Sequence, residues 1–257
     1  MCLILLALDA HPDYPLVVAA NRDEFYQRPT AAADFWTDAP TVIAGRDLLE
    51  GGTWLGLDRR GRFAAVTNYR QGRREAAAPR SRGHLVRDFL ISSAEPLEYL
   101  RGAEGDADRY NGFNLLAGDL HTLGYFSNRH GRPRVLPPGV YGLSNHLLDT
   151  AWPKVTSGKS TLAALLRRGE PQLTEALLEL LADSSRPSDD LLPETGIGRD
   201  WERLLSSAFI VSDGYGTRSS TVVLVGRDRR ALFVERSFGP EGAPAGTRRF
   251  EVTLAGV

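Results

Sequence analysis

The apolar run at residues 3–8 (LILLAL) constrains the fold more than any other part of the chain. Its side chains are apolar at odd and even positions alike, and successive side chains of a strand point to opposite faces. Such a strand has to be covered on both faces. The run stops at the turn-forming His11-Pro12-Asp13, and a second apolar run follows at residues 16–20. We therefore expect a hairpin inside a layered structure.

The register of this hairpin places the only cysteine, Cys2, beside a polar segment. The second run leads into Asn21-Arg22-Asp23-Glu24-Phe25. With the turn centred near Pro12 and Asp13, paired residue numbers sum to about 25, so Cys2 lies opposite Arg22 or Asp23. Two interpretations stay open: Cys2 is a small buried apolar residue, or it is a nucleophile exposed by removal of Met1.

The remaining pattern places helices between two groups of strands, which indicates an α+β fold. We expect helices near residues 83–92, 96–102, 150–168 and 172–183. The polar stretch QGRREAAAPRSRG before the first helix is expected to be an exposed loop. Strands are expected at residues 53–57, 63–68, 113–117, 122–126, around 135, 141–145, 208–212, 221–225, 231–238 and 249–254.

Composition excludes several classes of protein. The 257 residues are 42% hydrophobic with a net charge of −1, so we expect a single domain over residues 1–257 and no nucleic-acid partner. The first apolar run is far shorter than the ~20 residues of a membrane span and lacks a basic leader. One cysteine allows no internal disulfide, which fits a cytoplasmic location. The five histidines show no ligand spacing, so no metal site is expected.

Lysine occurs only at Lys154 and Lys159, while arginine is scattered along the chain. We interpret this as a compositional bias rather than as a phosphate-binding surface. The segment TSGKST near these lysines has Pro153 where a phosphate loop needs its first glycine, so it predicts no nucleotide site.

A cysteine at position 2 combines two reactive groups once Met1 is removed. The α-amine, with a typical pKa of about 7.7 to 8.0, is a usable base beside a thiol with a typical pKa of about 8.5. Nucleophile and base then belong to one residue. Catalysis would further need oxyanion donors, each worth about 3 to 4 kcal/mol.

Five segments resemble the transport-and-Golgi-organisation-2 family, also called NRDE proteins: MCLILLALDAHPDYPLVVAANRDEF, GGTWLGLDRRGRFAAVTNYR, SRGHLV, GLSN and YGTRSSTVVLV. That family is in turn similar to N-terminal-nucleophile hydrolases of the choloylglycine hydrolase and penicillin V acylase type. The resemblance implies a four-layer αββα sandwich.

The resemblance to these hydrolases also implies catalytic residues. Cys2 corresponds to the nucleophile, and Arg22 and Asp23 fall near an Arg/Asp pair that shapes the site and orients the amine. Asn68 and Asn145 match asparagines at strand ends, Asn145 being the oxyanion donor, and Arg218 matches an arginine that supports the nucleophile. In the hydrolases two residues separate the Arg and the Asp, whereas Arg22 and Asp23 are adjacent. Both can face Cys2 only if the strand has already ended.

The expected substrate-binding residues are Asn21, Arg22, Trp54, Tyr69 and Arg70. For Trp54, among the glycines of GGTWLG, packing in the core is the simpler interpretation. Asn68 and Asn145 could equally cap strand ends, and Arg218 could be a turn residue.

Two functions follow from the resemblance. The first is a cysteine-dependent amide or thioester hydrolase acting on a small acyl substrate, with no required cofactor. The alternative is a non-catalytic protein that binds and traffics haem, or lipid or acyl-CoA, on the same fold. No C-x-x-C-H haem-attachment motif is present.

Overall fold

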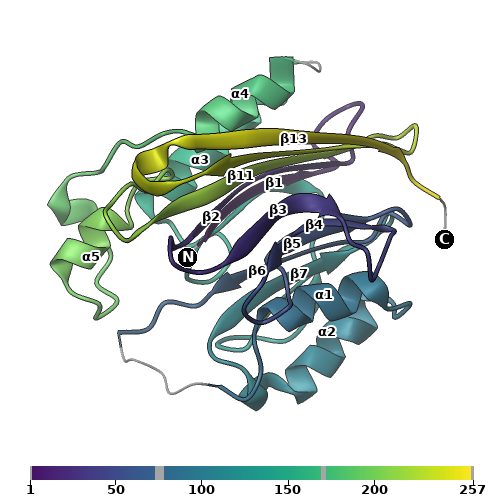
Figure 1. The fold of residues 1–257 in the computed structure, drawn as a ribbon, viewed down its shortest axis with the longest axis horizontal. Helices are drawn as coiled ribbons and strands as arrows, with labels where there is room; N and C mark the ends of the chain where they lie inside the picture. Colours follow the sequence, from purple (N-terminus) through teal and green to yellow (C-terminus); the bar gives the residue numbers. More distant parts are fainter. Residues whose placement is uncertain (1, 73–77, 169–171, 256–257) are drawn as a thin grey trace.

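The strands form two sheets stacked face to face (Figure 1). The computed structural model describes residues 2–72, 78–168 and 172–255, so Met1 and residues 73–77 of the expected loop lie outside the described residues. The first sheet runs in the order β10 (Gly139–Leu143), β1 (Cys2–Leu8), β2 (Leu16–Phe25), β11 (Tyr215–Val225), β12 (Arg230–Phe238) and β13 (Pro244–Thr253). The second runs in the order β3 (Thr30–Phe35), β4 (Val42–Asp47), β5 (Leu55–Asp58), β6 (Phe63–Asn68), β7 (Phe113–Gly118), β8 (Leu123–Ser127) and β9 (Arg134–Val135).

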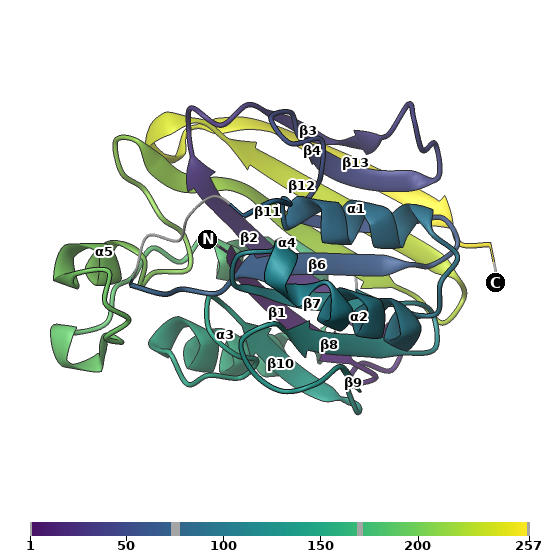
Figure 2. The ribbon, with the colours of Figure 1, turned by 90° about the horizontal axis from the view of Figure 1, so that it is seen from below.

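Helices cover the outer face of each sheet. Figure 2 shows α1 (Gly83–Ile91) and α2 (Pro96–Gly105) lying over the second sheet. The outer face of the first sheet packs on α3 (Pro153–Leu165) and α4 (Gln172–Leu181). The shorter helices are α5 (Arg199–Leu204) and the 3₁₀ turns Ala107–Arg109, Asp189–Leu191 and Pro240–Gly242. These layers confirm the expected α+β, four-layer αββα sandwich.

Strand β1 shows why its sequence is apolar throughout. Ile4 and Leu6 lie in the hydrophobic cluster between the two sheets, whereas Leu3 and Leu5 lie in the cluster shared with α3 and α4. All four are at most 2% exposed. Burial of a leucine or isoleucine side chain contributes about 1.5 to 3 kcal/mol, so this strand anchors both layers of the core.

The pairing of β1 with β2 confirms the predicted hairpin. Leu5 pairs with Ala19, and Cys2 pairs with Arg22, one of its two expected partners. Strand β2, however, does not end at residue 20 but continues to Phe25. The polar side chain of Asn21 is compatible with the sheet because its Nδ2 donates to the carbonyls of Leu181 and Ala208, both at 2.8 Å.

Other boundaries differ for recognisable reasons. The expectations lacked β3 and β4; β3 (TAAADF) is alanine-rich, and alanine is depleted in strands. The prediction of a strand at residues 208–212 is wrong, because that segment contributes only an isolated bridge from Val211 to Gly216. Helix α3 begins at Pro153 rather than at residue 150, since the residue before a proline is biased toward extended backbone, as Trp152 is.

The approach of Gly52 to Gly83 yields a first prediction. A Cβ on Gly52 would lie 2.5 Å from the carbonyl carbon of Gly83, at the start of α1. Gly52→Ala should therefore lower the free energy of unfolding by about 1 to 3 kcal/mol, as overpacking typically does. Urea denaturation measures the change. Gly102→Ala in α2, where the added methyl meets nothing within 4 Å, is the control and should not destabilise. Equal stability of Gly52→Ala and wild type would contradict this account.

Candidate active site around Cys2

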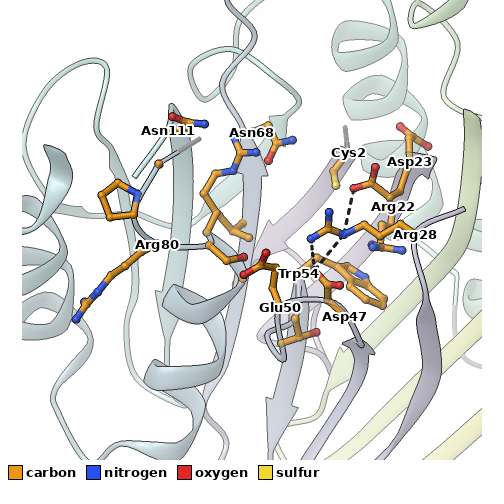
Figure 3. A pocket seen from close by; sticks show the side chains of 18 residues that line it. Cys2, Arg22, Asp23, Arg28, Asp47, Glu50, Trp54, Asn68, Arg80 and Asn111 are labelled. Atoms are coloured by element: carbon orange, nitrogen blue, oxygen red, sulfur yellow. Dashed lines mark hydrogen bonds and ion pairs between the residues drawn. The ribbon is translucent and has the colours of Figure 1, made fainter. Parts of the chain in front are cut away.

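A cavity of about 390 Å³ lies beside Cys2. Cys2 and Arg22 come from the first sheet, Val66 and Asn68 from the second, and the segment before α1 closes another side. Figure 3 shows the labelled side chains around this space. Its charged lining residues, among those described, are Arg22, Asp23, Glu24, Arg28, Asp47, Glu50, Arg80 and Arg82.

Because β2 continues as a strand, Arg22 and Asp23 point to opposite faces. Arg22 pairs with Cys2 and lies 4.1 Å over the ring of Trp54, while its Nη1 donates to Thr30 Oγ1 at 3.1 Å. The Asp23 carboxylate instead accepts a hydrogen bond from Thr217 Oγ1 at 2.7 Å. Arg22 thus lies on the same face of the sheet as Cys2. Asp23 points to the opposite face, where Thr217 holds it, although it still contributes to the cavity lining.

An ion-paired cluster that the sequence analysis missed lines the same cavity. Arg28 Nη2 lies 2.6 Å from Asp47 Oδ2, and Arg28 Nε lies 3.9 Å from Glu24 Oε2. Asp47 ends β4, and β3 and β4 are the two strands absent from the expectations. Only the pairing of these strands could have revealed the cluster, because 19 residues separate Arg28 from Asp47.

The two asparagines are connected but occupy different places. Asn68 lines the cavity, whereas Asn145 is fully buried and does not. Asn145 Nδ2 donates to the backbone carbonyl of Asn68 at 3.0 Å. Thr67 Oγ1 also donates to the carbonyl of Ser144, so the ends of β6 and β10 are tied together. Asn145 therefore fixes the strand end that presents Asn68.

Arg218 lies away from the Cys2 cavity. Its Nη1 donates to the carbonyls of Phe25, Tyr26 and Arg28, at 3.0, 3.2 and 3.3 Å. It lines a second cavity of about 370 Å³, and Arg22 and Trp54 form part of the lining of both cavities. Arg218 thus supports the turn after β2.

Three expected substrate-binding residues lie outside the cavity lining. Asn21 is buried behind the sheet, as described above. The Tyr69 hydroxyl shares a 2.8 Å hydrogen bond with His146 Nε2. Arg70 forms a buried ion pair with Glu202 at 2.6 Å. Trp54 and Arg22, by contrast, do line the cavity.

Burial dominates the electrostatics of the site. It raises the pKa of the Cys2 thiol and the pKa of the Asp23 carboxyl above their ordinary values, and it lowers the pKa of Arg22. The charge of Arg22 acts in the opposite direction on Cys2 and favours the thiolate. A thiol in this position reacts readily only with a base beside it.

The described residues offer neither a metal site nor a membrane-spanning helix. No group of three or more His, Cys, Asp or Glu residues could hold a metal ion there. None of the helices found in the described ranges has the length and apolarity needed to cross a membrane.

Known structures resemble this fold. The N-acylethanolamine-hydrolyzing acid amidase ortholog of Caenorhabditis elegans superposes with a TM-score of 0.50 at 13% identity, covering 87% of this chain and 92% of that one. A C2A mutant of the conjugated bile acid hydrolase from Clostridium perfringens gives a TM-score of 0.51 at 10% identity, with coverage of 98% and 92%. At these identities the likeness shows a shared fold of the N-terminal-nucleophile hydrolase type.

Sequence comparison identifies much nearer relatives. The Transport and Golgi organization protein 2 homolog of Bos taurus is 42% identical over 257 residues, covering 92% of this chain and 93% of the bovine protein. The Homo sapiens homolog is 38% identical over 275 residues and covers 99% of each chain. The family model described as Transport and Golgi organisation 2 matches residues 1–240. The chain therefore belongs to the Transport and Golgi organisation 2 family.

Proposed function

We propose that this protein is a cysteine hydrolase that cleaves an amide or thioester bond of a small acyl compound. The observation that carries the proposal is the position of Cys2: its thiol, the only one in the chain, lines a cavity of about 390 Å³ beside Arg22 and Asp23. Two proteins of similar fold support it, since one is named for hydrolysing N-acylethanolamines and the other for hydrolysing conjugated bile acids.

The mechanism requires removal of Met1, which makes the α-amine of Cys2 the chain terminus. This amine takes the thiol proton, directly or through water, because burial disfavours a free thiolate. Asp23 orients the amine. Its carboxylate is held by Thr217, and its strand position is one residue beyond that of Arg22, the partner of Cys2.

The thiolate attacks the acyl carbon, and the carbonyl oxygen becomes an oxyanion. The amide of Asn68, which lines the cavity, donates to this oxyanion, while Asn145 holds the strand end that carries Asn68. The intermediate collapses with breakage of the C–N or C–S bond, and the leaving group takes the proton from the Cys2 ammonium. The acyl group remains as a thioester on Cys2.

Water then releases the acyl group. The amine removes a proton from water, the resulting hydroxide attacks the thioester, and the thiolate leaves and is reprotonated. The charge of Arg22 favours the thiolate both when it attacks the substrate and when it leaves the thioester. Arg218 supports the turn after β2 and has no part in these steps.

The cavity fits haem less well than it fits an acyl compound. Haem needs an apolar slot for its ring and an axial ligand. Among the described lining residues Cys2 is the only candidate ligand, because no histidine is found among them. The described lining contains four arginines and four carboxylates, whose charges would face the porphyrin. The geometry therefore favours the hydrolase, and no step is assigned to haem.

The first test concerns Cys2 and Met1 together. Intact-mass measurement of the purified protein should show that Met1 is absent. Reaction with p-nitrophenyl acetate should give a burst of p-nitrophenolate, with an acetyl group on Cys2. Cys2→Ala should lose the burst completely while keeping the melting temperature of the wild type. Retention of Met1, or an undiminished burst in Cys2→Ala, would refute the mechanism.

A second test concerns Asp23. An amine that is not held in place can attack the neighbouring thioester, which moves the acyl group from sulfur to nitrogen as a stable amide. After p-nitrophenyl acetate, Asp23→Asn should therefore accumulate an acetyl group that resists hydroxylamine, whereas the acetyl group of the wild type is removed. Asp228→Asn, at an exposed turn, is the matched control. Fully hydroxylamine-sensitive acetylation of Asp23→Asn would exclude this role for Asp23.

A further inference from the structure

The second cavity, of about 370 Å³, is separate from the space that Cys2 lines, and the proposed mechanism does not use it. Its walls come from β3 of the second sheet and from β11, β12 and β13 of the first. Arg22 and Trp54 stand between the two cavities, because they contribute to both linings. The volume is in the range of small-molecule sites, which is about 300 to 1,000 Å³.

The charge of this cavity is mostly positive. Its charged lining residues, among those described, are Arg22, Arg218, Glu235 and Arg248. Arg248 pairs with Asp34 at 2.7 Å. Within residues 2–72, 78–168 and 172–255, Arg22 and Arg218 form no ion pair: Arg22 donates to the hydroxyl of Thr30, and Arg218 donates to backbone carbonyls. Two guanidinium groups without a bound carboxylate therefore line one cavity.

Aromatic rings hold both guanidinium groups without neutralising them. The guanidinium carbon of Arg22 lies 4.1 Å from the ring centre of Trp54, and that of Arg218 lies 5.7 Å from the ring centre of Tyr26. Such contacts orient a cation but leave its charge in place. Arg218 also keeps a buried Nε–H that has no hydrogen-bond partner in the described structure. An acceptor supplied by a ligand would improve this environment.

The carboxylates whose charges act on Arg22 are already engaged. Glu24 and Asp47 both pair with Arg28, on the side of the Cys2 cavity. Burial lowers the pKa of Arg22, and the positive charge of Arg218 lowers it further, against the attraction of these carboxylates. The two arginines therefore repel each other across the second cavity.

Glu235 does not cancel this positive charge. Its side chain is buried, with the residue only 1% exposed, and its Oε1 accepts a hydrogen bond from the backbone N–H of Ala33 at 2.6 Å. Burial raises the pKa of Glu235 above its ordinary value, which favours the neutral carboxyl. A negatively charged ligand thus meets more positive than negative charge in this cavity.

We propose that the second cavity binds the carboxylate or phosphate group of a small anionic molecule through Arg22 and Arg218. Both groups match the planar donor pattern of guanidinium. The hydroxyls of Thr30, Ser237 and Thr247, which also line the cavity, supply further donors. The site goes beyond the proposed hydrolase and does not depend on it, because binding needs no turnover.

The test is isothermal titration calorimetry of the full chain with glutarate and with glycerol 3-phosphate. Each anion is compared with an uncharged partner, glutaramide or glycerol. At least one anion should bind, about tenfold or more tightly than its uncharged partner, and the anion that binds identifies the preferred group. Arg218→Met should weaken this binding about tenfold or more. Arg230→Met, which removes the same charge at an exposed turn, should bind as the wild type does.

Absence of binding by both anions, or equal affinity for an anion and its uncharged partner, would overturn the proposal. So would lost binding in Arg80→Met with unchanged binding in Arg218→Met, because Arg80 lines the Cys2 cavity and not the second one. A crystal structure of the wild type with the anion that binds locates it without any substitution. Contact with Arg22 and Arg218 is expected, and an anion elsewhere would refute the site.

The proposed hydrolase and this site fail separately. Cys2→Ala should bind the anion as the wild type does, because Cys2 does not line the second cavity. Loss of the p-nitrophenyl acetate burst with intact anion binding would refute the hydrolase alone. A normal burst without anion binding would refute the anion site alone.

Discussion

The antiparallel pairing of β1 with β2 is the constraint on which the candidate site depends. It sets Cys2 opposite Arg22, and the continuation of β2 to Phe25 then decides the face of every following side chain. Arg22 shares the inner face with the thiol, and Asp23 is turned to the outer side. A strand that ended at residue 20 would leave both orientations undefined.

Two sets of polar contacts act on Cys2 from opposite sides of this pairing. On the inner side, Arg22 is fixed by Trp54 and Thr30 and favours the thiolate through its charge. On the outer side, Asp23 is fixed by Thr217. Burial works against ionisation of both Cys2 and Asp23, and a charged Asp23 further disfavours the thiolate. The reactivity of the thiol therefore depends on how far the positive charge beside it, such as that of Arg22, offsets these two effects. The reactivity of Cys2 therefore also depends on residues outside the cavity lining, such as Thr217, which holds Asp23.

Much of the fold could be predicted from the sequence, because its signals are local. The two-sided apolar pattern of residues 3–8 requires a covered strand, and the short hairpin determines its register within one residue. The segments that resemble the family led to Cys2, Arg22, Asp23, Trp54 and Asn68, which line one cavity. The cluster of Arg28 and Asp47 could not be predicted, because it forms only where β4 pairs with the alanine-rich β3. The position of Arg218 outside the lining of the Cys2 cavity could not be predicted, because the sequence does not reveal that its side chain turns to the carbonyls after β2.

The central claim is that the thiol and the α-amine of one residue act together. An alanine inserted between Met1 and Cys2 tests it most directly, because the thiol stays while its own amine becomes a peptide nitrogen. The measurement is the rate of p-nitrophenyl acetate turnover beside the rate of iodoacetamide alkylation. The account predicts that the insertion abolishes turnover while Cys2 remains open to alkylation. Turnover equal to that of the wild type would contradict it.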